Sequence, residues 1–346
     1  MKLTLKIVSC CFVFCASHSL LGQENTLSSK GKVTGKVFFN YHANTTSGVA
    51  QKSAFQLTRA YVGYTYNINK QFSTTVLLDA GKSAGGSDHS VFIKNAKITY
   101  KASEKITLSA GIFGMKQFKE QEKFWSYRYL YKSFNDEYKF GTSADAGVMA
   151  AIKLSSQFKI DLLFVNGEGY KKAQDINGST RIGANFVYKP SKNWTLKAYV
   201  DTMKGTDIVD ITKETTMTNS AFFIGYTIEN LFRIGAEYNT MQNGVSYKKP
   251  VAGINLQGVS VYATYIINKK WNVFGRFDQL TSDAQIGQLT NWNHFTSGNK
   301  TVIGFEYQPI KEVKIALNYR QADFIDFINR NDNNKSSIYA NLGFFF

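Results

Sequence analysis

The stretch YKPSKNWTLKAYVD, residues 188–201, carries the pattern that decides the fold of this chain. After a short polar turn, apolar residues alternate with polar ones from Trp194 to Val200. A period of two places the apolar side chains on one face of a β-strand. Lys197 and Asp201 occupy the opposite face, where an ionisable side chain needs water. This segment therefore predicts a strand with one apolar and one wet face.

The same unit repeats along the chain from residue 31 onward, with turns of two distinct lengths. Seven short turns are predicted at Asn67–Lys70, Lys101–Lys105, Ser155–Gln157, Lys189–Asn193, Glu229–Asn230, Asn268–Lys270 and Gln308–Glu312. Eight longer polar segments alternate with them, at Ala43–Ser53, Gly81–Ser90, Gly114–Thr142, Gly167–Ser179, Met203–Thr218, Met241–Asn255, Thr281–Ser297 and Ala322–Lys335. Alternating short turns and long loops are typical of bacterial outer-membrane barrels. We therefore predict an all-β transmembrane antiparallel barrel of about sixteen strands.

Aromatic residues of the apolar face gather beside the short turns. They are Tyr64, Tyr66, Phe72, Tyr100, Phe158, Tyr188, Trp194, Phe232, Tyr265, Trp271, Tyr307, Phe344 and Phe346. Such a ring at one height is the aromatic girdle of a membrane interface. The three prolines avoid the predicted strands, with Pro190 and Pro309 in short turns and Pro250 in a long loop. A soluble β-sandwich explains the alternation but not this placement.

The first 22 residues are predicted to be a cleaved signal peptide. Lys2 and Lys6 precede an apolar run from Ile7 to Ala16, which is too short to span a membrane as a helix. An alternative reading takes Cys10 as the lipidated cysteine of a lipoprotein. We expect residues 23–30 to be a short periplasmic lead and residues 31–346 to form the barrel, in the outer membrane.

The composition excludes several classes of function. All three cysteines lie before residue 23, so the mature chain is expected to have no disulfide and no thiolate metal site. His42, His89 and His294 lack metal-ligand spacing, so we expect no cofactor. No constellation of catalytic residues stands out, so we expect no enzymatic activity. Without Lys2 and Lys6 the net charge falls from +16 to +14. Export argues against nucleic acid and favours anionic lipid headgroups or anionic solutes as partners.

Three segments carry a resemblance to a known family. They are Leu57–Gly63, Phe274–Asp278 and the final strand Ser337–Phe346, which ends the chain in an aromatic residue. Together with the strand count, they resemble the phosphate-selective porins of the O and P type and their relatives in Bacteroidetes-like bacteria. The resemblance implies a homotrimer, an inward-folded third loop, an anion-selective channel, and recognition of Phe346 by the barrel-assembly machinery.

Parity along the strands predicts which charges face the pore. The inward bases are Lys36, Arg59, Lys97, Lys153, Lys159, Arg181, Lys197, Arg233, Arg276, Lys314 and Arg320. The inward acids are Asp79, Asp145, Asp161, Asp201, Glu237, Asp278 and Glu306. A sixteen-stranded barrel leaves an aqueous channel whose lining sets selectivity. Eleven bases against seven acids predict a porin for small hydrophilic solutes with a weak anion preference, or else a solvated wall without specificity.

The long segment Gly114–Thr142 is unusually rich in aromatic and basic residues. Exposed apolar area of this extent favours burial, so we predict a constriction loop inside the barrel. Its pore-facing residues would be Trp125, Tyr127, Arg128, Tyr131 and Lys132. Two alternatives remain for this loop: packing at a trimer interface, and aromatic stacking on the sugar rings of a saccharide. A structural or adhesive barrel with a blocked lumen is the alternative to a channel.

Overall fold

The computed structural model describes residues 30–48, 50, 52–82, 88–172, 180–206, 214–246, 249–250, 255–282, 297–326 and 331–346. The predicted signal peptide and residues 23–29 lie outside the described residues. The long strands are β1 (Gly31–Asn44), β2 (Ser53–Asn67), β3 (Phe72–Lys82), β4 (His89–Lys101), β5 (Ile106–Gly114), β6 (Ala144–Lys153), β7 (Phe158–Val165), β8 (Arg181–Tyr188), β9 (Trp194–Thr206), β10 (Glu214–Ile228), β11 (Phe232–Gln242), β14 (Leu256–Ile266), β15 (Trp271–Ser282), β16 (Gly298–Ile310), β17 (Val313–Asp326) and β18 (Asn331–Phe345).

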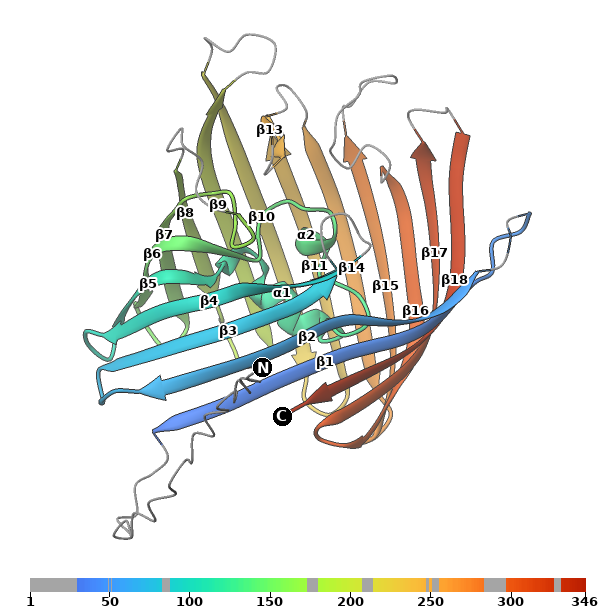
Figure 1. The fold of residues 1–346 in the computed structure, drawn as a ribbon, viewed down its shortest axis with the longest axis horizontal. Coiled ribbons are helices and arrows are strands. Elements are labelled where there is room, and N and C mark those ends of the chain that lie inside the picture. Colours follow the sequence, from blue (N-terminus) through green and yellow to red (C-terminus); the bar gives the residue numbers. More distant parts are fainter. Residues whose placement is uncertain are drawn as a thin grey trace, which may run out of the picture.

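These sixteen strands form one closed antiparallel barrel, which confirms the predicted fold class (Figure 1). Each strand pairs with its sequence neighbours, and the barrel closes where β1 pairs with β18, from Lys36 opposite Phe345 to Asn44 opposite Ser337. Backbone hydrogen bonds of 2.7 and 3.0 Å between Gly35 and Phe346 extend this seam. Closure leaves the sheet without an open edge, which a membrane requires.

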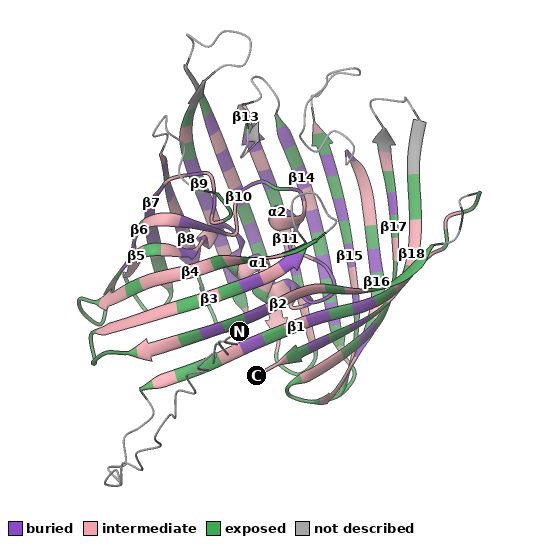
Figure 2. Cartoon of the chain, viewed as in Figure 1, coloured by how far each residue is buried: buried purple, intermediate pink, exposed green. Residues whose placement is uncertain are grey.

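The apolar face of the sheet is the outer face. On β15, Val273 and Phe277 are exposed on the outside, whereas Arg276 and Asp278 are buried inside. Figure 2 shows the same banding of exposed and buried positions along most strands. A soluble sandwich would have the opposite arrangement, with the apolar face inside. Among the described residues, no helix is long and apolar enough to cross a membrane.

The connections follow the predicted alternation of short and long, except for the last long one. Seven short connections lie between strands, and the third long one spans residues 115–143. The last loop, predicted at Ala322–Lys335, is much shorter, because β17 continues to Asp326 and β18 begins at Asn331. Strands in such barrels extend beyond the apolar zone, so polar sequence alone does not mark their ends.

Two prolines also lie in strands rather than in connections. Pro309 falls within β16, where the pairing with β17 shifts register between Tyr307 and Ile310. The missing N–H of proline is tolerated at such an irregularity. Pro250 belongs to β13 (Lys249–Pro250), which pairs with β12 (Val245–Ser246) in a separate two-stranded sheet outside the barrel wall.

Aromatic rings pair across neighbouring strands beside the short turns. Phe72 and Tyr100 stack with ring centroids 4.6 Å apart, and Trp271 and Tyr307 lie at the same separation. Rings at this distance add a specific attraction to their burial. The predicted girdle is therefore present at the short-turn end.

The third long connection contains the helices of the described chain. They are η1 (Lys116–Phe118), α1 (Lys119–Trp125) and α2 (Phe134–Glu137). Figure 1 shows them inside the ring of strands. We call residues 115–143 the third loop. The trimer-interface alternative for this loop is wrong, because its rings pack on inward-facing residues of the wall.

A glycine of β5 offers a test of the fold. Gly111 has φ of +107°, and an added Cβ would lie 2.2 Å from the Ala96 carbonyl oxygen. We expect Gly111→Ala to lower the free energy of unfolding by about 2 kcal/mol or more, because strain and overlap add. The urea midpoint of the barrel measures this. Gly275→Ala is the control, because an added Cβ there would lie 4.0 Å from its nearest neighbour, the Val302 carbonyl oxygen. Equal midpoints for the two variants would contradict the strained backbone and close contact at Gly111.

Candidate functional site

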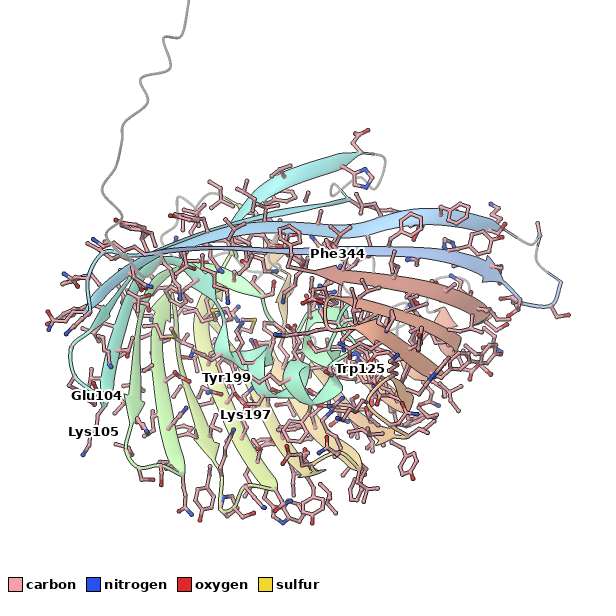
Figure 3. All side chains as sticks on the ribbon, turned by 90° about the horizontal axis from the view of Figure 1, so that it is seen from below. Glu104, Lys105, Trp125, Lys197, Tyr199 and Phe344 are labelled. Atoms are coloured by element: carbon pink, nitrogen blue, oxygen red, sulfur yellow. The ribbon has the colours of Figure 1, made fainter. Side chains whose placement is uncertain are left out.

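The third loop covers one side of the inner wall, formed mainly by β10, β11, β14 and β15. The ring centroid of Tyr127 lies 4.2 Å from that of Phe274, and Trp125 lies 5.8 Å from Tyr262. Phe134 belongs to a second buried cluster on the same side, with methionines and leucines of the wall. Figure 3, which looks at the barrel from below, places Trp125 and Lys197 within the ring of strands. The loop is therefore seated on the wall by aromatic packing.

Four inward cations of the wall donate hydrogen bonds to backbone carbonyl oxygens of the third loop. The pairs are Lys197 with Gln117, Arg233 with Phe124, Arg320 with Leu130, and Arg276 with Lys132. Hydrogen bonds from charged donors are stronger than neutral ones. We call these contacts the carbonyl clamp. They attach the loop at four points between residues 117 and 132.

All seven predicted inward acids are buried, with at most 7% of the residue surface exposed. Some accept hydrogen bonds from the third loop: Glu306 from the Tyr129 hydroxyl at 2.9 Å, and Glu237 from the Asn135 amide at 3.1 Å. Others pair with wall cations or accept from backbone N–H groups. A buried carboxylate needs such partners. The acids therefore serve the packing of the wall and loop and do not line an aqueous path.

The eleven predicted inward bases divide into three groups. Four form the carbonyl clamp, as described above. Three form ion pairs with wall acids: Arg59 with Asp79 at 2.9 Å, Arg181 with Asp201 at 3.3 Å, and Lys314 with Glu306 at 3.4 Å. The remaining four, which are exposed or half-buried, are Lys36, Lys97, Lys153 and Lys159. Most of the predicted lining thus has a structural role.

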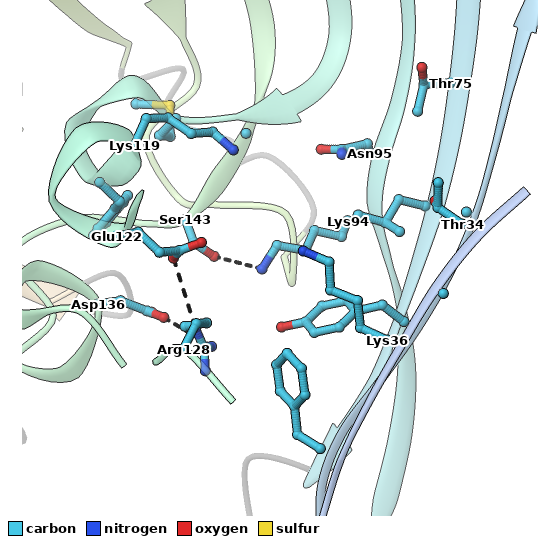
Figure 4. Close-up of a pocket in the computed structure, with 18 residues that line it drawn as sticks. Thr34, Lys36, Thr75, Lys94, Asn95, Lys119, Glu122, Arg128, Asp136 and Ser143 are labelled. Carbon is cyan, nitrogen blue, oxygen red and sulfur yellow. Dashed lines mark hydrogen bonds and ion pairs between the residues drawn. The ribbon is translucent and has the colours of Figure 1, made fainter. Parts of the chain in front are cut away.

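Two cavities remain between the third loop and the opposite wall, formed by β1 to β4. The short-turn cavity has a volume of about 390 Å³, and the long-loop cavity about 330 Å³. Both are lined by Lys94, Arg128, Asp136 and Ser143, so they meet at these four residues, which we call the neck. Figure 4 shows the short-turn cavity, with Lys36 and Lys94 facing Arg128 across it.

The walls of these two cavities are strongly basic. Ten bases line them: Lys36, Arg59, Lys82, Lys94, Lys119, Arg128, Lys132, Lys139, Lys171 and Lys172. Three acids do so: Glu122, Asp136 and Glu168. A channel-shaped region lined by one sign of charge concentrates ions of the opposite sign. We refer to the two cavities and the neck as the basic passage.

Lys94 is the residue of the neck that strand parity misses. Lys97 faces inward, so uninterrupted alternation would place Lys94 on the lipid side. The pairing of β3 with β4 shifts between Leu77 and Leu78, and this β-bulge turns Lys94 inward as well. A lysine at an outward position in mid-strand was the available sign of a bulge. Of the eleven bases predicted on the strands, Lys36 and Arg59 line the basic passage.

Ion pairs hold the charged groups of the neck in place. The Lys94 ammonium lies 3.0 Å from the Ser143 hydroxyl and 3.7 Å from the Asp79 carboxylate. Arg128 pairs with Asp136 at 3.2 Å. Burial by itself would raise the pKa of Asp136, but Arg128 and the neighbouring lysines lower it below the ordinary value. Asp136 is therefore ionised at neutral pH and neutralises part of the charge of Arg128.

The structure places the five predicted constriction residues in two groups. Arg128 and Lys132 line the basic passage. Trp125, Tyr127 and Tyr131 do not line it, because each of these residues is at most 5% exposed. Stacking on a sugar ring requires an exposed aromatic face, so these three rings do not support the saccharide alternative. Their apolar area is what seats the loop on the wall.

The described residues also contain no cluster of three or more His, Cys, Asp or Glu side chains placed to hold a metal ion. What the basic passage offers is an excess of cationic side chains, so its chemistry is the electrostatic attraction of anions.

The carbonyl clamp can be tested at Arg276, which also forms a buried ion pair with Asp278 at 2.7 Å. We expect Arg276→Leu to loosen the third loop, because removing one partner of a buried pair costs about 3–5 kcal/mol. Amide hydrogen exchange across residues 115–143 should then rise by more than about tenfold. Lys153→Gln, on an exposed part of β6, is the control. Unchanged exchange in Arg276→Leu would show that the clamp does not hold the loop.

Comparison with known proteins supports the barrel fold. Among solved structures, the outer membrane channel DcaP of Acinetobacter baumannii superposes with a TM-score of 0.68 at 13% identity, covering 91% of this chain and 97% of that one. An anion-selective porin from Comamonas acidovorans gives 0.66 at 9% identity, covering 91% and 99%. The trimer form of Vibrio cholerae OmpT gives 0.57 at 13%, covering 91% and 99%. These likenesses establish the fold alone.

The sequence itself matches one family model, described as "Putative beta-barrel porin-2, OmpL-like", over residues 138–346. No curated protein matches. The phosphate-selective O and P type resemblance is therefore not confirmed, whereas porin membership is. Fold and family together point to an outer-membrane channel rather than an enzyme. The chain belongs to the OmpL-like β-barrel porin-2 family.

Proposed function

We propose that this protein is a passive diffusion channel of the outer membrane with a preference for small anions. The observation that carries the proposal is the basic passage, where ten bases stand against three acids. The acids that parity assigns to the lumen are buried in contacts with the wall and the third loop. The solute path is therefore more basic than the whole interior.

The third loop acts in this proposal as the constriction. It fills the side of the lumen that faces β10 to β15, and so confines solutes to the side formed by β1 to β4. Arg128 contributes from the loop at the neck, and Lys94 contributes from the wall. Selectivity arises where a pore is narrow and charged. Lys94 and Arg128 should therefore contribute most to the selectivity of this channel.

Phosphate is included among the proposed solutes but not singled out. Lys94 and the Ser143 hydroxyl offer donors that suit any small oxyanion. Lysine is a flexible point charge, and tight phosphate recognition favours the planar fork of arginine. The preference should therefore be broad and weak. We also propose a homotrimer, as in the trimer form of the Vibrio cholerae neighbour.

Recording from purified protein in a planar bilayer under a potassium chloride gradient tests this function. We expect a reversal potential on the anion-selective side. Lys94→Gln should lower the ratio of anion to cation permeability by about twofold or more, because it removes a charge at the neck. Lys159→Gln, which removes an inward charge outside the basic passage, should change the ratio much less.

A different result of this experiment would contradict each part of the proposal. Absence of conductance would favour a structural or adhesive barrel with a blocked lumen. A reversal potential on the cation side would remove the anion preference and leave the channel. Equal effects of Lys94→Gln and Lys159→Gln would mean that selectivity is spread over the wall.

A further inference from the structure

The outer wall carries an apolar groove that the channel function does not use. The groove has a volume of about 690 Å³ and runs over strands β3 to β8. Its sides include Ile98, Leu108, Val148 and Phe164, all exposed on the outer face. We call it the wall groove.

Two alanines open the wall groove. Ala110 stands opposite Ile98 on β4 and Val148 on β6. Ala150 stands one row nearer to the short turns, opposite Leu108 and Leu162. Large side chains surround both positions, so the missing volume forms a hollow that reaches the backbone of β5 and β6. This hollow lies at membrane depth, above the girdle ring of Tyr100.

Something apolar must fill such a hollow in a bilayer. An empty space forfeits the dispersion contacts of every atom that lines it. Water does not fill it, because the lining offers no polar partners at this depth. Small residues on a membrane-facing surface allow another chain to approach closely. The occupant is therefore a lipid acyl chain or a second protein.

The charges at the short-turn end of the wall groove favour a lipid. The turn before β3 and the turn before β5 lie side by side, since the Lys101 amide donates to the Gln71 carbonyl at 2.8 Å. Lys70 and Lys105 are exposed on these turns, and in the described part of the chain neither has an ion-pair partner. Glu104, the one acid there, pairs with Lys101 at 2.9 Å. Figure 3 shows Glu104 and Lys105 at the rim of the barrel.

We propose that the wall groove binds one acyl chain of an anionic phospholipid of the periplasmic leaflet, with its phosphate beside Lys70 and Lys105. Short turns of such barrels face the periplasm, so headgroup and lysines lie at the same height. A second copy of this chain that contacts the groove through the same face would instead bring its own Lys70 and Lys105 beside these lysines. Charge complementarity therefore selects the phospholipid.

Native mass spectrometry of the purified full chain in detergent tests the proposal, with phosphatidylglycerol and phosphatidylcholine of equal chain length as probes. The wild type should retain phosphatidylglycerol in preference. Ala110→Phe fills the groove and should reduce this retention by about tenfold. Ala263→Phe is the matched control, because Ala263 faces outward on β14 away from the groove and is exposed. It should leave retention unchanged.

A second variant, Lys70→Gln with Lys105→Gln, changes only turn residues and leaves the barrel wall intact. Each lysine near an anionic surface contributes about 1 kcal/mol, which is about fivefold in affinity. The double variant should lose the preference for phosphatidylglycerol and keep its weak binding of phosphatidylcholine. An unchanged preference would overturn the role of the lysines.

Two results with Ala110→Phe would contradict the proposal that the wall groove binds lipid. Retention equal to that of the wild type would mean that the lipid binds elsewhere. A change of oligomeric mass without a change in lipid retention would assign the groove to contact between copies. None of these readouts depends on conductance, so the proposal stands or falls separately from the channel function.

Discussion

A sheet that crosses a bilayer must pair every backbone N–H and C=O group within itself, and the rest of this structure depends on that requirement. The seam between β1 and β18 meets it, and Gly35 and Phe346 carry the pairing to the last residue. Once the sheet is closed, strand parity fixes two surfaces. The outer one must be apolar, and the inner one receives most polar and charged side chains of the strands.

An interior crowded with charge does not by itself make a charged pore. The third loop occupies much of it, and the wall uses its charges to hold that loop. Lysine and arginine of the carbonyl clamp bind loop carbonyl groups, which carry no opposite charge, and the inward acids accept hydrogen bonds from loop side chains such as Tyr129 and Asn135. In the described part of the chain, the cavities of the basic passage lie on the side formed by β1 to β4. The position of the third loop thus determines which charges line them.

The sequence predicted the barrel, the girdle and an inward third loop, because a period of two and the placement of aromatic residues are local properties. It also placed Arg128 and Lys132 in the lumen, and both residues line the long-loop cavity. It did not identify Lys94, because one bulged residue reverses the parity of everything after it. It assigned Trp125, Tyr127 and Tyr131 to the pore, because composition indicates that the rings are buried but does not indicate which surface they pack on. Whether an inward base faces a solute or a carbonyl group depends on where the loop rests, which no strand pattern encodes.

Arginines supply most of the fixed contacts inside this barrel, and lysines supply most of the charge of the basic passage. All six arginines of the described chain have partners: Arg59, Arg128, Arg181 and Arg276 pair with aspartates, and Arg233 and Arg320 bind loop carbonyl groups. The planar guanidinium favours fixed acceptors, whereas the ammonium of lysine sits on a flexible stem and keeps its hydration. Eight of the ten bases of the basic passage are lysines. In the proposed channel, charges of this kind would attract anions without holding them tightly, and a pore conducts only when its solute can leave again.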